Sequence, residues 1–268
     1  MKFSLLMATY HLDDTLHLKQ SFISLDKQTV KPTEIIIIGD GPIPSKNILL
    51  IDELSLKFNV KFIQLEKQVK LGGALRKGLA ACSYPLVARF DTDDICEPHR
   101  FEIQLQYMAS NPNIDICGSY ASIIDENGTI KDELKRPLFH KSILQIIWSC
   151  PIIHPSVMMR KDKILKVGSY KSLLFSNQED YELWIRSANN GIKFGNIPKH
   201  LIRYRRSEKS KKYRNSILNG LAKLFYGLPA WFSFDRRLFS LFAIIYPVLR
   251  PLLPHKFNII IHKLDPRN

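Results

Sequence analysis

The segment Glu34-Ile-Ile-Ile-Ile-Gly39, followed by Asp40-Gly41-Pro42, decides the fold class of this 268-residue chain. Four consecutive isoleucines between Pro32 and a Gly-Asp-Gly-Pro turn predict a β-strand that ends sharply. What lies on either side of this strand determines the kind of sheet to which it belongs.

Strand-like and helix-like patterns alternate around it. Short apolar runs predict strands, and apolar residues at helical spacing predict helices between them. This alternation indicates βαβ units, and therefore a mainly parallel, Rossmann-like sheet flanked by helices. Beyond Pro112 the pattern is mixed. The predicted strands are 3–8, 34–39, 60–65, 85–90, 114–124 and 155–160; the predicted helices are 13–28, 45–58, 73–82 and 99–110.

Polar residues follow three of the predicted strands. Thr9 and Tyr10 come after the first strand, Asp40 after the second, and Asp91-Thr92-Asp93-Asp94 after the fourth. Ligands of such sheets bind at the carboxyl ends of the strands. We therefore expect these three groups to meet at one edge of the sheet.

The stretch Arg89-Phe-Asp-Thr-Asp-Asp94 places three carboxylates within four positions. Asp91 and Asp93 can share one ion if the backbone turns between them. Magnesium and manganese prefer oxygen ligands and often bind substrate phosphates as well. The alternative is a solvated acidic turn before the helix at 99–110, where negative charge is also favourable.

Five further segments occur in a recognisable order. They are ATYHLDD (8–14), LGGALRKGL (71–79), VARFDTDD (87–94), HPSVMMRKD (154–162) and NQEDYELWIR (177–186). Together with EIIIIGDG, this order resembles the inverting glycosyltransferases of sequence family 2, which have the GT-A fold. The resemblance extends from about Phe3 to Tyr204 and is greatest to bacterial enzymes that assemble surface polysaccharide repeat units.

The resemblance implies a role for each matching residue. The side that binds the nucleotide sugar comprises Thr9, Tyr10, Asp40, Arg76 and Asp91. Asp91 and Asp93 match the two acids of the family's D-x-D motif, which implies that they hold the divalent cation, manganese or magnesium. Asp180 matches the catalytic base. The chain has Gly41-Pro42 where the family often has Gly-Ser, and it lacks the Q-x-x-R-W motif, which implies single additions rather than polymer synthesis.

The chemistry of sugar transfer agrees with these roles. A cation at Asp93 stabilises charge on the leaving diphosphate, and a carboxylate at Asp180 accepts the proton of the acceptor hydroxyl. A single displacement of this kind inverts the anomeric centre. Retention through a nucleophilic Glu179 stays open from the sequence alone, as does a purely structural Asp180 at the start of a helix.

The basic residues concentrate near the end of the chain. Residues 199–268 hold 15 Lys and Arg against three acids, a net charge of +12 of the total +14. The apolar run 238–249 is too short to span a bilayer, but a basic segment with short apolar helices suits an anionic membrane surface. Packing of these helices on the domain is the alternative.

We expect a GT-A domain at 1–205, with a nucleotide-binding half (1–110) and an acceptor-binding half (111–205), and a basic amphipathic helical segment at 206–268.

The expected protein is thus a cytoplasmic enzyme at the inner face of the bacterial cytoplasmic membrane. It transfers a sugar, with UDP the expected nucleotide, to a saccharide linked to polyprenyl diphosphate in O-antigen or capsule assembly. Four cysteines without regular spacing indicate reduced thiols. Two rivals remain: a nucleotidyltransferase of sugar activation, and a nucleic-acid-binding protein that uses the basic segment. The acids at 91–94 disfavour a nucleic-acid partner.

Overall fold

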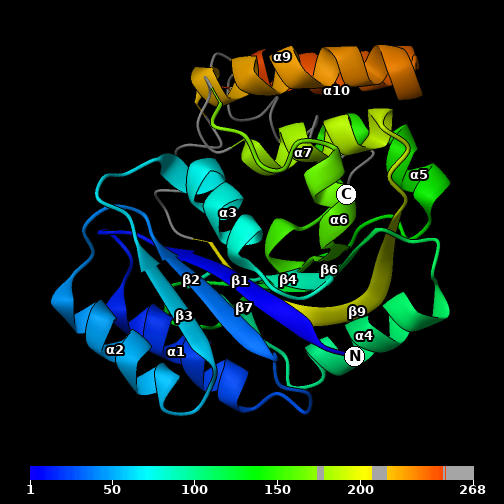
Figure 1. Ribbon diagram of the computed structural model, residues 1–268. Helices are drawn as coiled ribbons and strands as arrows, with labels where there is room; N and C mark the ends of the chain where they lie inside the picture. Colours follow the sequence, from blue (N-terminus) through cyan, green and yellow to red (C-terminus); the bar gives the residue numbers. More distant parts are fainter. Residues whose placement is uncertain (174–177, 207–215, 250, 252–268) are drawn as a thin grey trace.

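The computed structural model of the protein describes residues 1–173, 178–206, 216–249 and 251 (Figure 1). Its first half contains four parallel strands joined by helices, as the alternating pattern predicts. The elements are β1 (Phe3–Thr9), α1 (Thr15–Asp26), β2 (Glu34–Gly39), α2 (Ser45–Ser55), β3 (Val60–Gln64), α3 (Lys70–Ala81), β4 (Leu86–Arg89), β5 (Ile95–Cys96) and α4 (Arg100–Ser110).

The second half is mixed. It continues the same sheet, which in the described residues has nine strands in the order β3-β2-β1-β4-β8-β6-β9-β5, with β7 paired to β6. The parallel half is confirmed, but β8 runs antiparallel to both β4 and β6. The elements are β6 (Ile116–Ile124), β7 (Ile130–Leu134), α5 (His140–Gln145), the 3-10 turns at Ile147–Ser149 and His154–Ser156, β8 (Met158–Arg160), α6 (Lys161–Lys166), α7 (Glu179–Asn189) and β9 (Phe194–Arg205).

The isoleucine run of β2 is buried on both of its faces. Ile35 and Ile37 pack on the same side as α1, α2 and α4, whereas Ile36 and Ile38 pack on the side of α3 and α7. Figure 1 shows these two helical layers below and above the sheet. A strand in the middle of such a sandwich needs no polar face, which explains why the sequence has none.

Two boundaries differ from the sequence prediction. The helix expected from about Gly73 begins at Lys70, so Gly72 and Gly73 lie in its first turn and not in a loop. The strand expected at 155–160 begins with a 3-10 turn and is extended only from Met158.

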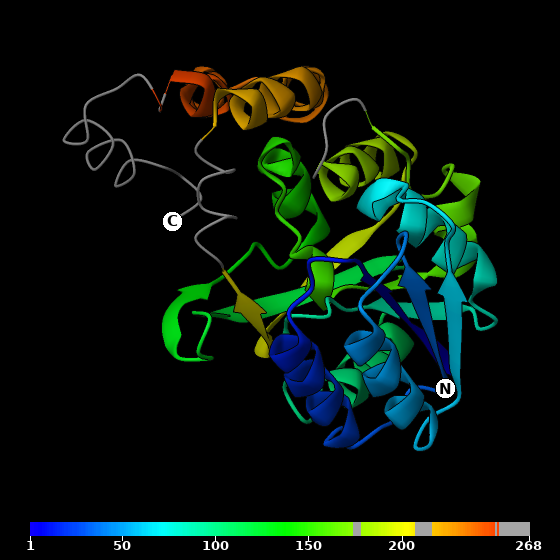
Figure 2. The ribbon, with the colours of Figure 1, turned by 90° about the vertical axis from the view of Figure 1, so that its left-hand side faces the viewer.

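Two C-terminal helices form a hairpin over the α3 and α7 side of the sheet. Figures 1 and 2 show α9 (Ile217–Phe234) and α10 (Leu238–Leu249) side by side above α7. Apolar residues at helical spacing over 214–228 predict a helix there. The observed helix α9 extends further, to Phe234, and residues 214 and 215 lie outside the described part of the chain. No described helix combines the length and the apolar character needed to cross a membrane.

Small residues allow this hairpin to pack tightly. A Cβ atom on Gly220 would lie 2.5 Å from the Pro247 carbonyl oxygen, and one on Gly227 would lie 2.5 Å from the Tyr181 hydroxyl. Trp231 is buried, and its indole N–H donates to the Arg237 carbonyl (2.8 Å). The hairpin is thus part of the packed structure.

Candidate active site

The strand ends meet at one edge of the sheet, as expected. Thr9 pairs with Gly39, and Gly39 pairs with Gln64, so β1, β2 and β3 end level with one another. The Asp40 N–H donates to the Thr9 carbonyl (2.8 Å), and Asp40 Oδ1 accepts the Val69 N–H (2.7 Å) at the start of α3. Thr9 and Asp40 are both buried, and the loops after the strands are therefore held by direct hydrogen bonds.

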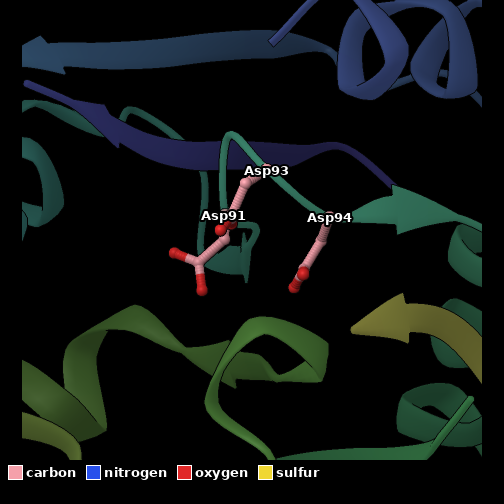
Figure 3. A group of neighbouring side chains, drawn as sticks. All are labelled: Asp91, Asp93 and Asp94. Atoms are coloured by element: carbon pink, nitrogen blue, oxygen red, sulfur yellow. The ribbon is translucent and has the colours of Figure 1, made fainter. Parts of the chain in front are cut away.

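Three carboxylates leave the loop between β4 and β5 close together (Figure 3). One oxygen from each of Asp91, Asp93 and Asp94 lies within 4.8 Å of the others. Asp94 is buried; its Oδ1 accepts the Arg205 N–H (2.8 Å), and its Oδ2 has no partner among the described residues. Asp94 thus joins the two acids that the resemblance identified.

The three acids fit a hard divalent cation. The side chain of Asp93 is exposed, yet crowding of its carboxylate by protein atoms, followed by the charges of Asp91 and Asp13, raises its pKa to about 7. Burial, followed by the charges of Asp93 and Asp91, raises the pKa of Asp94. Carboxylate oxygens are the ligands such cations prefer, and a positive ion would relieve both the repulsion and the unpartnered Asp94 oxygen.

Asp13 also belongs to this loop cluster, although the sequence did not single it out. Its Oδ2 accepts the Thr92 hydroxyl (2.8 Å) and the Tyr10 N–H (3.2 Å), and burial raises its pKa. It therefore ties the loop after β1 to the loop after β4. The sequence signal for Asp13 was the pair Asp13-Asp14 directly after a predicted strand. Asp14 serves as the N-cap of α1, but this capping role does not explain Asp13.

Arg89 is a second residue that the sequence prediction missed. Its side chain is almost completely buried and forms an ion pair with Asp91. Nε and Nη1 have no hydrogen-bond partner among the described residues. Burial opposes the charge, but Asp91 outweighs it and raises the pKa of Arg89, which keeps the guanidinium protonated. A charge inside the apolar run Pro-Leu-Val-Ala-Arg-Phe was the signal, since a buried charge needs a partner.

The predicted base lies at the start of α7. Asp180 Oδ1 accepts the Tyr181 N–H (2.7 Å), and the Cys150 thiol lies 3.6 Å from Oδ2. Burial raises the pKa of Asp180 above its usual value, while the positive charge of Arg89 opposes the shift. Burial, and then the neighbouring Asp180, raise the pKa of Glu179 to about 7. A carboxylate with a raised pKa is a better proton acceptor than a free aspartate.

One pocket of about 660 Å³ joins the two acidic groups. Tyr10, Asp91 and Asp180 line it, and so does Arg89. Thr9 and Asp40 are buried and do not line it, and neither do Asp93 and Arg76. Arg76 is exposed in the middle of α3. The structure thus gathers Tyr10, Asp91 and Asp180 at one pocket but does not include Arg76 in its lining.

His154, Trp148 and Trp184 could each belong either to the site or to the core, and the structure distinguishes the two. His154 lines the pocket, and burial followed by the charge of Arg89 lowers its pKa, so it is neutral. Its Nε2 lies 2.8 Å from the Tyr170 hydroxyl. Trp148 lines the pocket while donating its indole N–H to Asp235 (2.8 Å). Trp184 is fully buried in the core below α7 and has a structural role.

Comparison with known proteins identifies the family. The family model described as glycosyl transferase family 2 matches residues 4–168, more than half of the chain. The chain belongs to glycosyl transferase family 2. It is therefore a glycosyltransferase, and family 2 enzymes generally use a divalent cation, which agrees with the acidic cluster after β4.

Two curated relatives show what kind of family 2 enzyme it resembles. The amylovoran biosynthesis glycosyltransferase AmsE of Erwinia amylovora is 38% identical over 205 residues, which is 76% of each chain. An Escherichia coli UDP-Gal:alpha-D-GlcNAc-diphosphoundecaprenol beta-1,3-galactosyltransferase is 37% identical over 224 residues, 83% of this chain and 81% of its own.

A solved structure shares the fold. The crystal structure of Staphylococcus aureus TarS 1–349 in complex with UDP superposes with a TM-score of 0.67 at 16% identity, covering 99% of this chain and 76% of that TarS chain. At this identity the likeness concerns architecture alone. It confirms the expected fold class, the GT-A arrangement of family 2.

Proposed function

We propose that this family 2 enzyme is a metal-dependent, inverting glycosyltransferase that adds one sugar from a UDP-sugar to a lipid-diphosphate-linked saccharide in bacterial surface polysaccharide assembly. The observation that carries the proposal is the single pocket lined by both Asp91 and Asp180. This cavity contains both Asp91, on the side of the sugar donor, and Asp180, the proposed base. The E. coli relative, named for a UDP-galactose donor and a diphosphoundecaprenol-linked acceptor, supports the substrate class.

Each group has a defined role in the reaction. Asp180 takes the proton of the acceptor hydroxyl as the hydroxyl oxygen attacks the anomeric carbon, and the bond to the diphosphate breaks on the opposite face. A divalent cation held by Asp91, Asp93 and Asp94 would supply positive charge to the leaving diphosphate. Arg89 holds Asp91 through its ion pair and keeps positive charge between the two acidic groups.

The donor side comes from the first half of the chain, residues 1–110, with Thr9, Tyr10, Asp40, Arg76 and Asp91 on the nucleotide sugar. Residues 111–205 form the acceptor side. The buried Thr9 and Asp40 would act mainly through backbone groups and loop shape, because Asp40 Oδ1 is already engaged by Val69.

Product analysis tests this function directly. The purified protein is incubated with a panel of nucleotide sugars and N-acetylglucosamine-diphosphoundecaprenol, with and without manganese. Release of UDP together with a product longer by one sugar, dependent on manganese, is expected. Release of pyrophosphate would instead indicate nucleotidyl transfer, and salt-sensitive binding of random oligonucleotides without sugar transfer would favour a nucleic-acid-binding protein.

The outer face of the C-terminal hairpin supports association with a membrane. On α9 the small residues, Asn219 and Trp231 face the domain, whereas several large apolar side chains are exposed. An exposed apolar surface of this kind marks an interaction site, and the net charge of +12 in residues 199–268 suits anionic lipid. The exposed apolar residues are Ile217, Leu218, Leu221, Phe225, Phe232, Leu238, Phe239, Phe242 and Leu249.

We therefore place the enzyme at the cytoplasmic face of the bacterial inner membrane, bound through residues 206–268. Vesicles containing phosphatidylglycerol should retain the protein, and the double variant Phe225→Ser with Phe242→Ser should be retained much less, because both rings lie on the outer face. Deletion of 229–268 should have a larger effect. Equal retention of all three proteins would contradict the membrane assignment.

A further inference from the structure

The wall of the pocket beside Asp180 carries positive charge from two distant parts of the chain. Arg136 follows β7, and Lys223 lies on the inner face of α9; both line the pocket and both are half-buried. We propose that Arg136 and Lys223 bind the diphosphate of the lipid-linked acceptor, while α10 receives the first part of its hydrocarbon chain. This inference rests on the proposed function and names the acceptor subsite of the same pocket.

The position of these two cations comes from their neighbour Cys150. Its Sγ atom lies 3.6 Å from Asp180 Oδ2. Burial, and then Asp180, raise the pKa of the Cys150 thiol, and the charges of Lys223 and Arg136 act in the opposite direction. Both cations line the same pocket as Cys150 and Asp180, and their charges reach the Cys150 thiol. An acceptor sugar whose hydroxyl reaches Asp180 would hold its own anomeric phosphate about one ring width away, on the cationic wall.

The donor diphosphate has a different place in the same pocket. Its expected partners are the acids after β4 and their cation, together with Arg89, which pairs with Asp91. Arg136 and Lys223 come from the second half of the chain and from the hairpin. Two sets of positive charge in one pocket match a reaction in which both substrates carry a diphosphate.

Lys223 is the one charged residue of α9, a helix that packs against the rest of the protein. The buried residues of this helix are Asn219, Gly220, Ala222, Gly227, Ala230 and Trp231. Lys223 is half-buried and lines the pocket, so an acceptor that enters the pocket would meet its positive charge.

The hydrocarbon part of such an acceptor also finds a suitable surface. Ala243, Ile244 and Pro247 of α10 line the pocket next to the cations. Gly220 brings α9 close to Pro247, so the apolar wall is continuous with the hairpin. The outer face of the same hairpin carries Phe225 and Phe242, which the proposed function places in the membrane interface. One hairpin therefore links the lipid surface to the base.

Binding of farnesyl diphosphate tests the inference without requiring sugar transfer. Calorimetric titrations are made with the full-length protein already saturated with UDP and manganese, so that the donor site is filled. We expect binding by the wild type, a loss of about tenfold or more in Arg136→Gln and in Lys223→Gln, and near wild-type binding in Lys223→Arg. Arg236→Gln, which removes a charge from the exposed hairpin loop, is the matched control and should bind as the wild type does.

Three results would overturn the inference. They are unchanged binding in both glutamine variants, equal binding of farnesol and farnesyl diphosphate by the wild type, and a weakened affinity for UDP instead of for the polyprenyl diphosphate. A melting temperature close to that of the wild type shows that each variant is folded. Failure of the proposed function looks different: no sugar is transferred, although farnesyl diphosphate still binds through Lys223 and Arg136.

Discussion

Replacing Glu179 by glutamine should remove a pH-dependent cost that the carboxylate imposes on the fold. Glu179 is only 8% exposed. Burial, followed by the charge of Asp180, raises its pKa from an ordinary value of 4.5 to about 7. Because the folded state favours the protonated acid, the stability from this group is complete at low pH and is lost as the pH rises from 4.5 through 7.

The size of the effect follows from the shift. With one pKa unit worth about 1.4 kcal/mol, the wild type loses about 2 to 3 kcal/mol between pH 5 and pH 8 through this group. Glutamine is neutral over the whole range, so Glu179→Gln should gain that amount relative to the wild type on going from pH 5 to pH 8. If the amide of the glutamine side chain is poorly hydrogen-bonded, the resulting loss of stability is the same at both pH values. It therefore cancels when the stability at pH 5 is compared with that at pH 8.

Urea unfolding at pH 5 and pH 8 measures this difference, with EDTA present so that no cation changes the local charge. Glu133→Gln is the control. The Glu133 carboxylate is exposed and lies 2.8 Å from Lys135, which lowers its pKa, so its pH effect should be small and of opposite sign. If Glu179→Gln shows the same stability difference from the wild type at both pH values, the reasoning about the buried acid pair is wrong.

Three other variants test the site and the hairpin. Asp180→Asn should lower the rate of sugar transfer by about 10² to 10⁴, the usual contribution of a general base, with UDP binding measured by calorimetry unchanged; near-normal transfer would exclude Asp180 as the base. Asp93→Asn should weaken the binding of manganese and abolish its stimulation of transfer, and a manganese titration as in the wild type would contradict the cation assignment. Gly227→Val should destabilise the protein by about 1 to 3 kcal/mol, seen as a lower melting temperature, because any Cβ there would lie 2.5 Å from the Tyr181 hydroxyl; an unchanged melting temperature would mean that the hairpin is not tightly packed there.

Local sequence predicted what depends on local physics. The isoleucine run of β2 forms the predicted strand, and β1 and α4 likewise form where the spacing of apolar residues predicts them. The order of motifs then located Asp91 and Asp180 in the same pocket. Nothing in the sequence indicated that β8 would enter the sheet antiparallel between β4 and β6, because pairing depends on contacts between residues far apart in the chain.

The C-terminal hairpin shows most clearly what the sequence could not predict. Apolar residues at helical spacing over 217–228 predict an amphipathic helix, and the usual expectation is that the large side chains face the protein. The structure has the small residues inside and Leu218, Leu221 and Phe225 outside. Gly220 and Gly227 decide this, because only a helix face without side chains can approach Pro247 and Tyr181 so closely.

The sequence by itself determined the four parallel strands of the first half, most helices, the family and the identity of the main acids, since each depends on residue type and spacing along the chain; β5, β7 and β9 were not predicted. Only the tertiary structure decided that Asp94 joins the acidic cluster, that Arg89 is a buried cation beside Asp91, and that Lys223 lines the same pocket as Asp180. These relations join segments that are distant in sequence, and burial, which sets their charges, is a property of the folded chain alone.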